Sequence, residues 1–178
     1  MTIEFDSMAA LATHLAGAVV ADIEVANRHS LTAAAKILKD DMRGQIGEYQ
    51  AALGDYPAWE PLAESTEDEK ARIGAPAEAP LERFGDLEKS FRSEVVGNHE
   101  AIIGSTDPVM EYHEFGTSKM APRPVVGPAL LRNVDAIEKL IGGEAYAVVC
   151  GQRLGYRFSK ETGIGPIGGE PSDSGSGE

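Results

Sequence analysis

The sequence has little cysteine, little basic charge and no long apolar run. Its one cysteine, Cys150, excludes an intrachain disulfide and a cysteine-rich metal cluster. Lys and Arg number 16 against 29 Asp and Glu, and the net charge of −13 argues against tight, sequence-independent binding to nucleic-acid phosphates. The uncharged stretch from Ser7 to Ala21 is shorter than the roughly 18–20 residues that span a bilayer. We therefore expect no membrane-spanning helix.

What is present suffices for one globular domain. The chain has 178 residues, of which 42% are hydrophobic, so a real core is available. We expect a single domain over residues 1–160. Gly, Ser, Pro and acidic residues dominate the end of the chain, and residues 161–178 are predicted to form a flexible tail.

Two segments carry the spacing of amphipathic helices. Apolar residues recur three and four positions apart between Asp6 and Ile46, which predicts one long N-terminal helix capped by Asp6 or Ser7. Either Asn27–Ser30 breaks this helix, or the helix projects toward a neighbouring molecule. The same spacing after Gly127-Pro128 predicts a C-terminal helix that stops at Gly142-Gly143. Residues 144–158 fit a strand or a helix, and helix is favoured.

Between these helices, the pattern alternates with a period of two. Phe91, Ser93 and Val95 are expected on one face of a strand, Gly97-Asn98 in a hairpin turn, and residues 99–104 in the returning strand. Alternation over Val109–Phe115 predicts a third strand that ends at Gly116. The expected fold class is therefore α+β: a long N-terminal amphipathic helix, a small antiparallel sheet (the hairpin plus the third strand) and a C-terminal helix packed on it.

Residues 48–82 form an acidic stretch. Nine acidic residues face only Lys70 and Arg72, for a local charge of −7, and four prolines interrupt the segment. We expect an irregular excursion with one short helix near Glu64–Arg72. It is either a solvated loop or an acidic surface that faces a partner or a lumen.

Few residues offer catalytic chemistry. His99, Glu111 and His113 are the basis of one alternative, a small metal-dependent hydrolase, but the sequence contains no His-Glu-x-x-His helix. It also lacks a Gly-x-Ser-x-Gly elbow and a phosphate-binding loop. We therefore expect no enzymatic activity, no metal and no cofactor.

The most distinctive segment follows the predicted third strand. Gly116 permits a backbone conformation closed to other residues, and closely spaced prolines stiffen the connection to the C-terminal helix. Two basic residues lie here in an otherwise acidic chain. The segment is either a rigid surface loop or a docking element, whose residues would be Glu114, Phe115, Gly116, Thr117, Ser118, Lys119, Met120, Pro122, Arg123, Pro124 and Pro128.

Three motifs together resemble a known family. They are the run from Tyr112 to Pro128, the Trp59-Glu-Pro-Leu62 element and the Gly85-Asp-Leu-Glu-Lys-Ser90 lead into the hairpin. This combination resembles the HK97 gp10-like tail-completion and head-tail joining (neck) proteins of long-tailed bacteriophages, with Mu-type virion morphogenesis proteins as distant relatives. The secondary motif residues that carry the resemblance are Trp59, Pro61, Leu62, Gly85, Leu87 and Ser90.

The resemblance implies a non-enzymatic virion protein, located at the head-tail junction and assembled in the host cytoplasm. It implies a homo-oligomeric ring, with a hexamer favoured and a dodecamer possible. The partners would be the head-completion or connector proteins and the tail terminator or tail tube protein. Genomic DNA would pass through the ring without sequence-specific binding. An alternative is an adaptor or terminator ring of a phage-related injection device or gene transfer particle.

Overall fold

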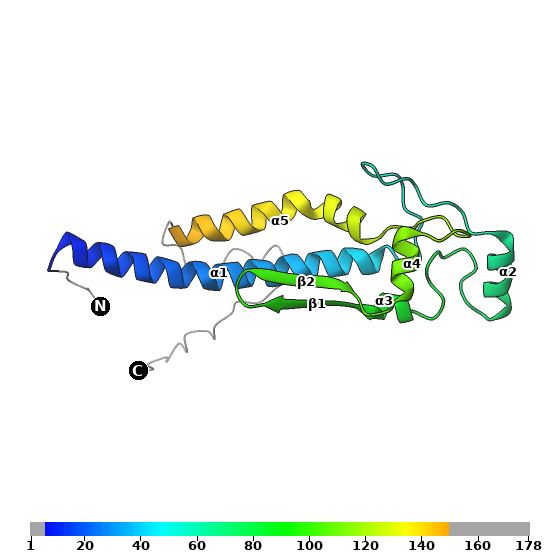
Figure 1. Cartoon of the computed structure of the whole chain (residues 1–178), viewed down its shortest axis with the longest axis horizontal. Coiled ribbons are helices and arrows are strands. Elements are labelled where there is room, and N and C mark those ends of the chain that lie inside the picture. Colours follow the sequence, from blue (N-terminus) through cyan, green and yellow to red (C-terminus); the bar gives the residue numbers. More distant parts are fainter. Residues whose placement is uncertain (1–5, 150–178) are drawn as a thin grey trace, which may run out of the picture.

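The computed structural model describes residues 6–149 and shows an elongated α+β arrangement (Figure 1). Of the segment 144–158, residues 144–149 are helical, as favoured, whereas residues 150–158, Cys150 included, and the predicted tail 161–178 lie outside the described residues. The elements in chain order are α1 (Met8–Gly44), α2 (Glu64–Arg72), α3 (Asp86–Ser90), β1 (Phe91–Val96), β2 (Glu100–Ser105), α4 (Val109–Phe115) and α5 (Val126–Val149).

Helix α1 is continuous, so the expected alternative of a break at Asn27–Ser30 is wrong. The Ser7 side chain caps its start by accepting a hydrogen bond from the Ala10 N–H at 3.1 Å. His29 and Ser30 lie on the buried face of the helix, with exposed fractions of 7% and 1%. Packing against α5 holds this region helical.

Helix α5 runs antiparallel along α1 (Figure 1). Leu140 packs against Ala33 and Ala34, whose small side chains allow the two helices to approach closely. Further along, a buried Glu144 carboxylate lies 3.1 Å from the Nδ1 atom of His29. The predicted stop at Gly142-Gly143 is wrong, because burial of the following turns against α1 outweighs the low helix propensity of two glycines, about 1 kcal/mol each.

The N-terminal part of α1 extends beyond the end of α5 (Figure 1). None of the side chains that the structure describes between Met8 and Val25 is buried, and the first buried one among the described side chains of the helix is that of Ala26. Met8, Val20 and Val25 are all more than half exposed. This part of α1 therefore presents apolar side chains that no other described element covers.

The predicted hairpin is confirmed. Strand β1 pairs antiparallel with β2, from Phe91 opposite Ser105 to Val96 opposite Glu100. Phe91, Ser93 and Val95 lie on the more buried face, as the alternation predicts. Among residues 6–149 the sheet has these two strands alone.

The predicted third strand is wrong, because Val109–Phe115 forms helix α4. Asp107 accepts a hydrogen bond from the Val109 N–H at 2.9 Å, which stabilises the first turn, and Met110 is buried in the core. A seven-residue segment is short enough for two-residue and 3.6-residue spacing to be confused. The connection at Gly116 is consequently a helix-to-helix loop rather than a strand-to-helix loop.

The main core lies at the end of the molecule opposite the free start of α1. It joins side chains from α1, α3, β1, α4, α5 and the acidic excursion: Leu38, Met42, Trp59, Leu87, Phe91, Met110, Val125 and Ala129. Helix α2 occupies the predicted residues within the excursion. The excursion thus contributes Trp59 to the core while Glu64 and most of its other acidic residues remain exposed.

Candidate functional site

The three motif segments of the sequence meet at the core end of the molecule. The Trp59 indole N–H donates to the Pro124 carbonyl at 3.3 Å. In return, the Arg123 Nη2 atom donates to the backbone carbonyls of Glu60 and Pro61 at 3.0 and 3.4 Å. Leu87 packs in the same core cluster. Residues far apart in the sequence therefore form one interlocked unit.

Several of the secondary motif residues stabilise this unit from the core. Trp59, Leu87 and Ser90 are buried, Leu62 is half-buried and Pro61 is exposed. The Ser90 hydroxyl donates to the Leu87 carbonyl at 2.6 Å and lies 2.6 Å from the Ser105 hydroxyl. Gly85 supplies a left-handed backbone conformation, with φ of 78°, at the start of α3.

Glu114 points into the protein and caps helix α5. Its carboxylate accepts hydrogen bonds from the backbone N–H groups of Val125, Val126 and Gly127, at 2.8, 3.2 and 3.4 Å. These donors have no partner within the helix, and a negative charge at a helix N-terminus is favourable. Glu114 therefore fixes α5 relative to α4.

Gly116 is the point at which the chain leaves α4. Its φ of 74° and ψ of 178° are open essentially to glycine alone. A Cβ atom there would lie 2.9 Å from both the Met120 carbonyl oxygen and the Pro122 nitrogen. Thr117 and Met120 close the tip by exchanging backbone hydrogen bonds of 2.9 and 3.3 Å. A glycine is required for this turn.

The predicted docking residues separate into two sets. One set is turned outward, namely Phe115, Thr117, Ser118, Lys119 and Pro122. The other set is buried or half-buried and builds the loop, namely Glu114, Gly116, Met120, Arg123, Pro124 and Pro128. Phe115, the last residue of α4 before the turn, is 78% exposed. We define Phe115–Lys119 as the loop tip.

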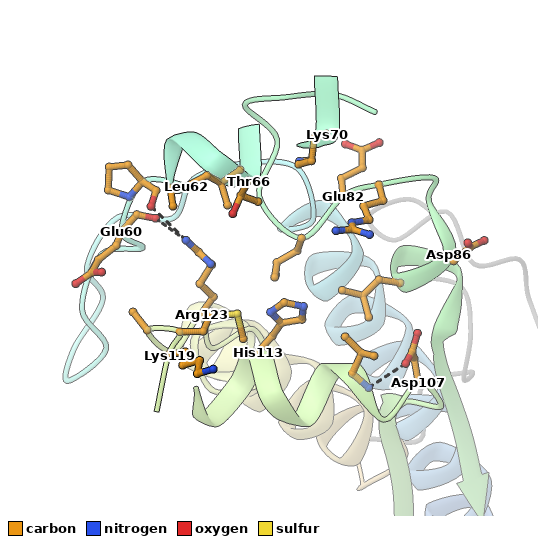
Figure 2. Close-up of a pocket in the computed structure, with 18 of the residues that line it drawn as sticks. Glu60, Leu62, Thr66, Lys70, Glu82, Asp86, Asp107, His113, Lys119 and Arg123 are labelled. Carbon is orange, nitrogen blue, oxygen red and sulfur yellow. Dashed lines mark hydrogen bonds between the residues drawn. The ribbon is translucent and has the colours of Figure 1, made fainter. Parts of the chain in front are cut away.

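A pocket of about 760 Å³ lies beside this loop (Figure 2). Its walls come from the 60–63 segment, α2, the 81–87 segment, α4 and the loop. His113 projects into it from α4, and Arg123 crosses it toward the carbonyls of Glu60 and Pro61 (Figure 2). The backbone N–H of Arg123 also donates to the His113 carbonyl at 2.7 Å, so loop and helix are joined here.

Two pocket side chains have shifted pKa values. Burial lowers the pKa of His113, the nearby Arg123 lowers it further and Asp107 opposes the shift. Burial also lowers the pKa of Lys70, while Glu82 opposes that shift. The Lys70 ammonium donates to the Ala79 carbonyl. Both shifts follow from partial removal of charged groups from water.

His113 should make stability pH-dependent. Because its folded-state pKa lies below the ordinary 6.5, the unfolded chain binds more protons as the pH falls through that value. The free energy of unfolding should therefore decrease on acidification, and His113→Gln should remove part of this decrease.

The decrease is measured from the urea unfolding midpoints at about pH 5 and about pH 7.5. His99→Gln, at the exposed hairpin turn, is the control and should behave like the unmodified protein; equal pH dependence for all three proteins would contradict the prediction.

The structure does not bring together the residues of the hydrolase alternative. His99 is exposed beside the hairpin turn, whereas Glu111 and His113 lie on α4. Within residues 6–149, no three His, Cys, Asp or Glu side chains are grouped so that they could hold a metal ion. Over the same residues, no helix is long and apolar enough to cross a membrane.

Sequence reasoning missed several buried or half-buried polar side chains that organise the interior. Gln45 donates to the Val125 carbonyl at 3.1 Å, Arg43 donates to the Phe91 carbonyl at 3.0 Å, and His29 meets Glu144. For His29 a signal existed, because it lies three residues after Ala26 and four before Ala33 on the buried stripe of α1. Gln45 and Arg43 gave no comparable signal.

Comparison with protein-family models, with curated proteins and with solved structures finds no match to this chain. The bacteriophage resemblance is therefore carried by the motif residues alone.

Proposed function

We propose that this chain is a structural protein of a head-tail connector. It forms a ring that joins the connector of a DNA-filled capsid to the tail tube and lets the genome pass. Its partners are further copies of itself, the head-completion or connector proteins and the tail terminator or tail tube protein. It acts by binding and not by catalysis.

The observation that supports this proposal best is the mutual locking of the three motif segments. Hydrogen bonds to backbone atoms of neighbouring segments are formed by the side chains of Trp59, Arg123 and Glu114. The effect is to hold the loop tip, with Phe115 outward, in a fixed position. A preorganised, exposed aromatic side chain is what a docking surface needs, because little entropy is lost on binding.

Uncovered apolar surface supports the ring. The start of α1 has no described neighbour, and α5 also carries exposed apolar residues, namely Leu130, Leu131, Val134 and Ile141. Contacts between two different faces of one subunit generate rings when the rotation closes. We infer that the free part of α1 packs on the α5 surface of the next subunit.

The charge of the chain supports passage of DNA. A net charge of −13 repels phosphates, so a lumen lined by this protein would let DNA slide without sticking. The exposed acidic side chains of the 48–82 excursion are the candidates for that lining.

The mass and symmetry of the purified protein test the ring. Light scattering on a sizing column should give a mass of about six or twelve subunits, since closed cyclic symmetry is the rule for such assemblies. Negative-stain images should show a pore that admits a DNA duplex. A protein that stays monomeric alone and also after mixing with tail tubes would overturn the proposal.

Phe115→Ser tests the loop tip separately. Because Phe115 is 78% exposed, its loss should leave folding and ring mass unchanged. It should reduce the yield of joined, infectious particles at least about tenfold, as expected for removal of a central aromatic contact. The readout is complementation of particles that lack the protein. Ile102→Ser, an exposed apolar change on β2, is the matched control and should complement normally; equal yields from both variants would exclude the loop tip as a docking surface.

A further inference from the structure

The pocket beside the loop holds a buried cation without an anionic partner. Arg123 is 7% exposed, yet no carboxylate of residues 6–149 forms an ion pair with it. Its Nη2 atom donates hydrogen bonds to two carbonyl oxygens, and its Nε atom is buried without a partner. Carbonyl dipoles offset only part of a buried guanidinium charge, which is normally matched by an anion.

One donor nitrogen of Arg123, Nη1, is left without a partner among the described residues. Among the described residues, Nη1 makes no hydrogen bond and is not enclosed, and the side chain forms part of the pocket wall. Lys119 lies on the same wall, has an exposed side chain and forms no ion pair with a described residue. In Figure 2 the Arg123 guanidinium lies beside Glu60, whereas Lys119 lies at the loop end of the same side of the pocket.

The acidic side chains of the pocket lie away from this position. Asp107 is engaged with the Val109 N–H, and the Glu60 and Asp86 carboxylates lie at the outer edge of the view in Figure 2. Glu82 lies on the opposite wall, near Lys70. One part of the pocket is therefore positive although the chain as a whole is strongly negative.

The rest of the pocket wall is largely apolar, so a bare ion would leave most of the wall without contacts. Leu62, Leu81, Val109 and Met120 line the pocket beside the polar groups. A pocket of about 760 Å³ is also far larger than one carboxylate. The occupant that fits combines a single negative charge with apolar side chains on either side.

We propose that this pocket binds an extended segment of a partner protein by an acidic side chain, whose carboxylate pairs with Arg123 Nη1 and is attracted by the Lys119 ammonium from the loop, while flanking apolar residues contact the pocket wall. Arg presents the planar donors that a carboxylate prefers. Only the identity of the partner, a protein of the neck, rests on the proposed joining function. Binding itself is measurable without any assembly.

Two peptides and one salt test the pocket on the full chain. The probes are acetyl-Leu-Glu-Leu-amide, its Gln counterpart and inorganic phosphate. Binding of each is measured from the NMR chemical shifts of the Lys119 amide and the Arg123 side chain. The Glu peptide should bind at least about tenfold tighter than the Gln peptide. It should also raise the pKa of His113, because a carboxylate beside Arg123 offsets the influence of that cation.

Lys119→Glu is the decisive variant, because the side chain is exposed and its change should leave the fold intact. It should weaken binding of the Glu peptide at least about fivefold. Lys139→Glu, which makes the same charge change on the exposed face of α5, is the control and should not. Equal affinity for the two peptides, preference for phosphate, or equal effects of the two variants would overturn the proposal. Ring mass is measured in parallel, so that a failed ring and an empty pocket remain separate results.

Discussion

Gly116→Val is expected to lower the free energy of unfolding by about 3 kcal/mol and to abolish particle joining. Valine is strongly disfavoured at a φ of 74°. Its Cβ atom would also lie 2.9 Å from backbone atoms of Met120 and Pro122, which cannot move without opening the turn. Urea unfolding measures the stability, and complementation of particles tests the proposed role in joining.

Gly104→Val is the matched control for this change. Gly104 lies in β2, where nothing occupies the space within 4 Å of an added Cβ atom, and its φ is outside the positive range. A β-branched residue also suits a strand. The control should be as stable as the unmodified protein. If Gly116→Val is equally stable, the turn does not require glycine and the loop tip is not held as described.

Glu114→Ala is expected to lower the free energy of unfolding by about 2 kcal/mol, because three N–H groups at the start of α5 lose their acceptor. Glu114→Gln keeps one acceptor oxygen but loses the charge. Its free energy of unfolding should therefore lie between those of the unmodified protein and Glu114→Ala. Joining should decrease as well, since the loop between α4 and α5 loses its anchor. Urea unfolding and complementation measure the two effects.

Glu111→Ala separates capping from general charge effects. Glu111 is exposed on the same helix, and its carboxylate forms no hydrogen bond or ion pair with a described residue. Its removal should change stability little, as is usual for surface substitutions. A loss equal to that of Glu114→Ala would show that overall charge, and not the cap, sets the stability.

Strong local signals correctly predicted most of the elements. The long helix, helix α2 and the hairpin with Phe91 inward were all evident from spacing and turn residues. The failures were α4, read as a strand, and the glycine pair that does not stop α5; the short helix α3 was not predicted. In both places the local pattern was compatible with two structures, and packing against the rest of the chain selected one of them.

For the candidate site, the sequence indicated which residues matter but not how each is used. It singled out Glu114, Arg123 and Trp59 through their motifs, while giving no sign that all three are turned inward. It also placed Lys119 in the same loop without linking it to a pocket.

The sequence by itself determined the class of the fold, the acidic character of the surface and the position of the glycine turn, because these depend on composition and on local backbone preferences. Only the tertiary structure decided which loop residues face solvent, which carboxylate caps α5 and which cation lacks an anionic partner. Those outcomes depend on contacts between segments distant in the sequence, such as Glu60 with Arg123, and spacing along the chain carries no information about them.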